Sequence, residues 1–151
     1  MPMVEQHVRA FGVGYEGRDL GEFIELLQHE GVALLVDVRL NAISRKRGFS
    51  KTALAKALAE AGIVYEHMRE LGNPKWNRAG FGGTPAELGV ARGAYSAQLL
   101  GPDAQECLGR IAEAGRQRMV AVMCFEIDQR RCHRDLVLSA VSERSSYPIS
   151  A

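Results

Sequence analysis

The sequence predicts an α/β fold in which a mostly parallel central sheet carries helices on both faces. Residues 32–37 and 119–124 form two short runs that are apolar almost throughout, which is typical of strands buried on both faces. Segments with helix-capping residues separate the strand-like runs, and consecutive parallel strands need a crossover of this kind. We therefore expect residues 1–151 to form a single compact α/β domain.

The first half of the chain alternates strands and helices. We expect strands over residues 7–13, 32–37 and 63–66, and helices over residues 19–30 and 50–61. The first helix is indicated by the capping-box spacing of Asp19 and Glu22, and Gly31 suits its end. Ser50 is a good N-cap for the second helix.

The second half begins with a segment rich in glycine and proline. We expect a loop over residues 68–92, helices over residues 93–100, 103–114 and 133–143, and a strand over residues 119–124. A loop of that length in a compact domain is usually functional or mobile. Asp103 caps the helix that follows the Gly101-Pro102 break.

Charge and hydropathy limit the classes of partner. The formal net charge is +1, which argues against nonspecific nucleic-acid binding through overall charge. Residues 36–52 are nevertheless locally basic, with five lysines and arginines against the single acid Asp37. No apolar run is long enough for a membrane helix, and the N-terminus lacks the apolar core of a signal peptide. We therefore expect a cytoplasmic protein without a membrane partner, and the sequence leaves its oligomeric state open.

Polar clusters follow three of the expected strands. Because ligands bind beyond the carboxyl ends of parallel strands, these clusters are expected to converge on one pocket. The expected contacts to a substrate or anion are Asp37, Arg39, Ser44, Arg45, Tyr65, His67 and Arg134. Guanidinium groups bind phosphate bidentately, so a small phosphate-bearing molecule or a nucleic acid is the expected partner.

The candidate catalytic residues are Cys124, Glu126, Cys132 and His133. Three cysteines in a reducing compartment favour free thiols over a disulfide framework. Cys132 is expected to be the most reactive, because a helix N-terminus and neighbouring cations stabilise a thiolate. The sulfurs of Cys124 and Cys132 could still approach each other, as a redox couple or around a shared ligand. Cys107 lies within an apolar helix stripe and is expected to pack in the core.

Three functions remain open at this point. The favoured one is an enzyme that acts on a phosphate-bearing substrate, with the thiols as nucleophile or redox group and with Glu126 and His133 moving protons. The second is a non-catalytic module that binds nucleic acid or a partner protein through the same arginines. The third and weaker one is a metal site on Cys124, Cys132 and His133, and the sequence gives no motif for a cofactor. We also expect Glu126 to pair with Arg39 or Arg134, since a lone buried carboxylate is costly.

Five motifs in order resemble the "domain of unknown function 488" family across nearly the whole chain. They are residues 36–39 with 43–45, residues 48–50, residues 62–67, Leu71-Gly72, and Cys124-x-Glu126 with Cys132-His133-Arg134. The resemblance implies a compact α/β fold and a bacterial or archaeal cytosolic protein, but it implies no reaction. Family members commonly have Gly-His-Ser after the first strand, where this chain has Gly14-Tyr15-Glu16. They also commonly have a proline before the Ser-Arg pair, at the position where this chain has Ala42.

Overall fold

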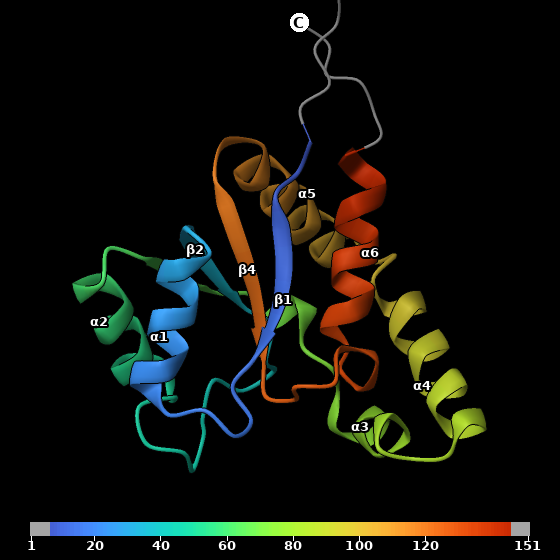
Figure 1. Cartoon of the computed structure of the whole chain (residues 1–151). Helices are drawn as coiled ribbons and strands as arrows, with labels where there is room; N and C mark the ends of the chain where they lie inside the picture. The colour runs from blue at the N-terminus through green and yellow to red at the C-terminus, as the bar shows by residue number, and fades with distance from the viewer. Residues whose placement is uncertain (1–6, 146–151) are drawn as a thin grey trace, which may run out of the picture.

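A four-stranded sheet in the order β1-β4-β2-β3 lies at the centre of the computed structural model, which describes residues 7–145 (Figure 1). The strands are β1 (Ala10–Gly14), β2 (Val32–Asp37), β3 (Val64–His67) and β4 (Met119–Cys124). All three strand pairs are parallel. The predicted α/β class and the parallel sheet are therefore confirmed.

The two central strands, β2 and β4, are the two most apolar runs of the sequence. They are buried along nearly their whole length, which explains why they lack the alternation of a half-exposed strand. Their register pairs Val36 with Val122 and Asp37 with Met123. The carboxyl ends of the two strands consequently lie side by side, with Asp37 next to the end of β4 at Cys124.

One face of the sheet is covered by α1 (Leu20–His29) and α2 (Lys51–Glu60) (Figure 1). Phe23 of α1 and Leu54 of α2 are fully buried in the core on this face, together with Leu35 and Met123 of the central strands. The capping box at the start of α1 forms as predicted. Both helices match the expected ranges to within about one residue at either end.

The opposite face is covered by α5 (Pro102–Gln117) and α6 (Arg134–Ser145), with α3 (Lys75–Phe81) and α4 (Pro85–Gln98) packed beside them (Figure 1). Cys107 is buried in this core, as its position in an apolar stripe predicts. Two short 3₁₀ turns, η1 (Arg69–Leu71) and η2 (Gln129–Arg131), follow β3 and β4. The predicted helices in this half are confirmed, although α5 is longer than expected at both ends.

The expectation of a loop over residues 68–92 is wrong, because η1, α3 and the first half of α4 occupy most of that segment. A capping box joins Thr84 and Glu87, with Pro85 in the first turn of α4. The buried amide of Asn77 donates to the Ala91 carbonyl over 2.9 Å and so ties α3 to α4. The glycines in this segment obscured the helical pattern.

Among residues 7–145, no helix combines the length and the apolar composition that crossing a membrane requires.

Candidate functional site

A cleft of about 500 Å³ opens at the carboxyl ends of β2 and β4, the position expected for a ligand site in a parallel sheet. Five of the residues singled out from the sequence line it: Arg39, Cys124, Glu126, Cys132 and His133. The loop after β2 and the loop after β4 therefore meet at one cavity.

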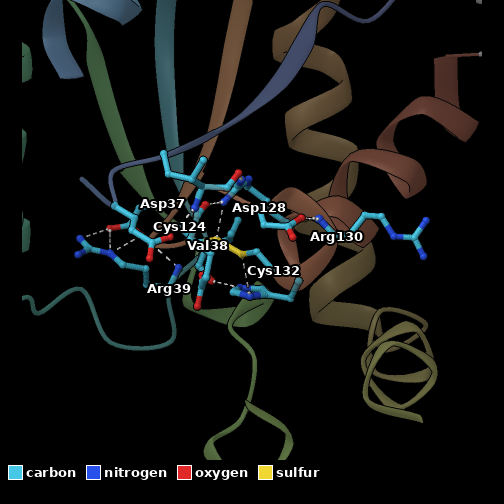
Figure 2. Close-up of a disulfide and its surroundings, with 12 residues drawn as sticks. Asp37, Val38, Arg39, Cys124, Asp128, Arg130 and Cys132 are labelled. Atoms are coloured by element: carbon cyan, nitrogen blue, oxygen red, sulfur yellow. Dashed lines mark hydrogen bonds and ion pairs between the residues drawn. A yellow bond between two sulfur atoms is a disulfide. The ribbon is translucent and has the colours of Figure 1, made fainter. Parts of the chain in front are cut away.

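Cys124 and Cys132 lie at disulfide distance on the wall of the cleft (Figure 2). Cys124 ends β4, and the chain doubles back through η2, where the Asp128 side chain accepts a hydrogen bond from the backbone of Arg130. The expectation of free thiols therefore fails for this pair and holds for Cys107, which is buried and unbridged. The alternative in which the two sulfurs approach each other across the eight-residue separation is the one that the fold realises.

The sulfur of Cys124 lies between a buried cation and a carboxylate. Arg134 is only 2% exposed, and its Nη1 donates to Cys124 Sγ over 3.1 Å. The same guanidinium donates to the backbone carbonyls of Glu126 and Ile127. Burial lowers the pKa of Arg134, partly offset by the charge of Glu126. Arg134 thus holds the sulfur and the loop after β4, and it contacts Cys124 rather than the adjacent Cys132.

The Glu126 carboxylate lies on the other side of this sulfur, with Oε2 at 3.4 Å from Cys124 Sγ. Among the ion pairs within residues 7–145, none includes Glu126. The expected ion pair with Arg39 or Arg134 is therefore wrong: Arg134 binds the backbone carbonyl of Glu126, and the half-buried carboxylate is solvated enough to need no partner. The carboxylate therefore faces the Cys124 sulfur and the cleft.

His133 is held as a neutral, buried imidazole. Its Nε2–H donates to the Val38 carbonyl over 2.7 Å, and its Nδ1 lies 3.6 Å from Cys132 Sγ. Burial lowers the pKa of His133 to about 4, and the charges of Arg134 and Arg78 act in the same direction. At neutral pH the ring therefore presents the Nδ1 lone pair toward Cys132.

Asp37 and Arg39 form a buried ion pair beside the Cys124–Cys132 pair (Figure 2). Asp37 is fully buried, and Arg39 Nη2 contacts its Oδ2 at 2.6 Å. Tyr65 donates its hydroxyl proton to the same oxygen over 2.6 Å, and His67 Nε2 donates to the backbone carbonyl of Arg39 over 2.7 Å. The guanidinium of Arg39 also donates to the hydroxyl of Tyr15 over 3.1 Å.

These contacts determine how the network can act. Burial opposes the charge of Arg39, yet the hydrogen bond and charge of Asp37 raise the pKa of Arg39 overall. Burial and the same carboxylate raise the pKa of Tyr65. Most N–H donors of Arg39 are therefore occupied within the protein. Tyr65 and His67 do not line the cleft; they hydrogen-bond to Asp37 and to the Arg39 backbone and so stabilise the ion pair.

The loop between β2 and α2 places its polar residues differently from the sequence expectation. The Ser44 hydroxyl accepts from the backbone of Lys46 over 3.1 Å, so it stabilises the loop. Ser50 occupies the N-cap position of α2, but its hydroxyl bonds to the Ser44 backbone and does not cap the helix. Arg45 is exposed and does not line the cleft.

Several polar residues of the cleft were not among the expected site residues, namely Tyr15, Asn41, Asn73, Arg78 and Arg131. Tyr15 stacks on Phe49 at 4.4 Å between ring centroids, and its position directly after β1 was a usable signal. Arg131 is fixed by bonds from Nη1 to the carbonyls of Phe81 and Gly83. Asn73 follows the polar cluster after the third expected strand, which was a usable signal, whereas Arg78 lies in the segment that was expected to be a loop.

The parallel sheet, with a cysteine-lined cleft at its carboxyl edge, defines an α/β protein whose main candidate site is built from strand-end loops. The chain belongs to the domain of unknown function DUF488 family, whose model matches residues 19–141 of the 151-residue sequence. The match includes both cleft cysteines, whereas Gly14-Tyr15-Glu16 precedes it. Searches of the curated proteins and of the solved structures each find no match.

Proposed function

We propose that the protein is an enzyme that uses the Cys124 thiol on a small phosphate-bearing substrate in the cleft. The contact of Arg134 with Cys124 Sγ carries this proposal, because a buried cation at 3.1 Å stabilises a thiolate over a thiol. Glu126, at 3.4 Å from the same sulfur, is within reach to accept the thiol proton. A nucleophile with an adjacent cation and base is the arrangement that covalent catalysis requires.

Two arginines at the cleft are suited to bind the phosphate. Arg131 is fixed through Nη1, with its side chain 40% exposed, so part of its guanidinium fork faces solvent. Arg78 is exposed and donates through Nε to the Asn73 carbonyl, and within residues 7–145 its terminal nitrogens have no hydrogen-bond partner, so they can bind a ligand. Guanidinium groups with free nitrogens bind phosphate through charge-assisted hydrogen bonds. Arg39 instead shapes the cleft wall through its ion pair with Asp37.

Cys132 is the partner of the reactive thiol in this proposal. In the reducing cytosol, where we propose that the protein acts, cysteine pairs at disulfide distance are mostly transient and catalytic or redox-sensing. A disulfide between Cys124 and Cys132 would block the nucleophile, so the dithiol is the active form. The substrate class is a nucleotide or a nucleic-acid end.

The test is turnover of nucleoside phosphates and phosphorylated oligonucleotides by the fully reduced protein, followed by ³¹P NMR. We expect Cys124→Ser to abolish turnover while it leaves substrate binding intact, and Cys107→Ser to retain both. Arg131→Met should weaken binding about tenfold, since a charge-assisted hydrogen bond is worth roughly 1.5 kcal/mol or more.

Arg130→Met is the matched control for the arginine variant. Arg130 neighbours Arg131, but it is exposed and points away from the sulfur pair (Figure 2). Turnover that survives in Cys124→Ser, or binding that falls equally in both arginine variants, would overturn the proposal.

A second function, a nucleic-acid binding module without catalysis, is favoured by one observation. Trp76, which lies between the cations Lys75 and Arg78 on α3, is 75% exposed and available to stack on a base. In that case Trp76→Ala would weaken binding of single-stranded oligonucleotide, and Cys124→Ser would change nothing. The two functions are therefore separated by the same pair of variants.

A further inference from the structure

We propose that the reduced Cys124–Cys132 pair, together with His133, forms a binding site for a zinc-class divalent metal ion. The two sulfurs and an imidazole nitrogen lie within 4.8 Å of one another, and all three residues are buried. Two thiolates and an imidazole are ligands that zinc prefers. This inference rests on the proposed function in one respect only, namely that Cys124 is available as a thiolate.

The spacing of the Cys132 sulfur and the His133 nitrogen fits a tetrahedral ion, whereas the two sulfurs lie at disulfide distance and must move apart on reduction to bind one. Zinc bonds of about 2.3 Å to sulfur and 2.0 Å to nitrogen separate the two ligand atoms by roughly 3.5 Å at a tetrahedral angle. Cys132 Sγ and His133 Nδ1 are 3.6 Å apart. The Cα atoms of the cysteines are 7.3 Å apart, above the roughly 4.4–6.8 Å that is usual for disulfides. The backbone is thus better spaced for two sulfurs around an ion than for a direct bond.

The surroundings orient these ligands. A metal-bound histidine usually donates its second ring N–H to a carbonyl or carboxylate, which fixes the ring and its tautomer. His133 does so through Nε2 to Val38, which leaves the Nδ1 lone pair directed toward the sulfurs. Arg134 donates to Cys124 Sγ over 3.1 Å, as an outer hydrogen-bond donor to a ligating thiolate would.

The charges balance at this site. Two thiolates neutralise a divalent ion, and the carboxylate of Glu126 lies close enough to offset the charge of Arg134. Three protein ligands leave a fourth position toward the cleft, since all three residues line it. An ion bound there would occupy the Cys124 sulfur, so metal binding and thiol chemistry exclude each other.

The states interconvert in balanced steps. Reduction of the disulfide takes two electrons and two protons from a thiol reductant such as glutathione, which becomes its own disulfide, and yields two thiols. Metal binding then releases both thiol protons to solvent and forms two metal–sulfur bonds. The site therefore binds metal in the reduced protein and not in the oxidised one.

The full chain is first reduced by a phosphine under argon. It is then titrated with Zn²⁺ in competition with a chromophoric chelator, and separately with Co²⁺, whose binding is followed by absorption. We expect one ion per chain, thiolate-to-cobalt charge-transfer bands, and Zn²⁺ protection of Cys124 and Cys132 from alkylation. Cys132→Ser and His133→Gln should each weaken Zn²⁺ binding by at least about 10–100-fold. Cys107→Ser is the matched control and should bind Zn²⁺ as the parent does.

Circular dichroism establishes that each variant is folded, and the two ligand variants serve as independent tests should one of them unfold. Absence of one-to-one binding by the reduced parent, or undiminished binding by a folded Cys132→Ser or His133→Gln variant, would overturn the inference. A reduced protein that binds no metal but turns over a phosphate substrate through Cys124 would overturn this inference alone. Metal binding with turnover that survives in Cys124→Ser would overturn only the proposed function.

Discussion

Replacement of Asp37 by asparagine tests the buried ion pair that shapes the cleft. Asp37 is fully buried, and Arg39 is 7% exposed. The carboxylate accepts from Arg39 through the backbone nitrogen, Nε and Nη2, and from the Tyr65 hydroxyl. Asparagine preserves the shape but removes the charge, so the Arg39 guanidinium stays buried without its counter-ion. Removing one partner of a buried pair costs about 3–5 kcal/mol.

That loss is a large fraction of the total stability of a small domain, about 5–15 kcal/mol. Urea unfolding followed by circular dichroism measures it as a shift of the midpoint at constant slope. Glu25→Gln is the control, because it removes an exposed carboxylate from the middle of α1 and should change stability by less than about 0.5 kcal/mol. An Asp37→Asn variant that loses less than about 1 kcal/mol would refute the reasoning, since the pair would then not be held in a desolvated setting.

Three further substitutions, one of them a control, test a hydrogen bond and the packing around the site. Tyr65→Phe removes a hydrogen bond to the buried Asp37 carboxylate and should cost about 1.5–3 kcal/mol in the same urea assay; an unchanged midpoint would show that the bond contributes nothing. Gly14→Ala should lower the melting temperature, because its methyl group would collide with the Glu126 backbone, whereas Gly89→Ala on α4 meets open space and should stabilise by about 0.5–1 kcal/mol. Equal melting temperatures for the two alanine variants would contradict this account.

The fold could be predicted from the sequence wherever one local pattern dominated. The runs 32–37 and 119–124 are β2 and β4 to the residue, because only buried parallel strands are apolar on both faces. Residues 68–92 were misjudged because glycines dilute the helical pattern of α3 and α4. Gly89 and Gly93 have no neighbour where a Cβ would be, so the helix tolerates them at the surface. The capping box at Thr84 was the signal that outweighs them.

The site could be located from the sequence more readily than its contacts could. Strand-end placement brought Arg39, Cys124 and Glu126 to one cleft, because parallel strands share their carboxyl edge. Their partners depend on side-chain packing that no spacing encodes. Arg134 crosses to Cys124 although it is adjacent in sequence to the Cys132-His133 pair. The sequence predicted that Arg134 would act on Cys132, whereas in the structure its guanidinium contacts the sulfur of Cys124.

The pH dependence of alkylation at each cysteine of the reduced, chelator-treated protein tests the central claim most directly. Mass spectrometry resolves the three sites, and Cys107 is the internal reference, since burial and the charge of Glu70 raise its pKa to about 11. We predict that Cys124 reacts as a thiolate with an apparent pKa below about 8.5, the value of an unperturbed thiol, because Arg134 stabilises the anion. Cys132→Ser should leave that value low. An apparent pKa for Cys124 at or above about 8.5, or a lower one at Cys132, would contradict the assignment of Cys124 as the reactive thiol.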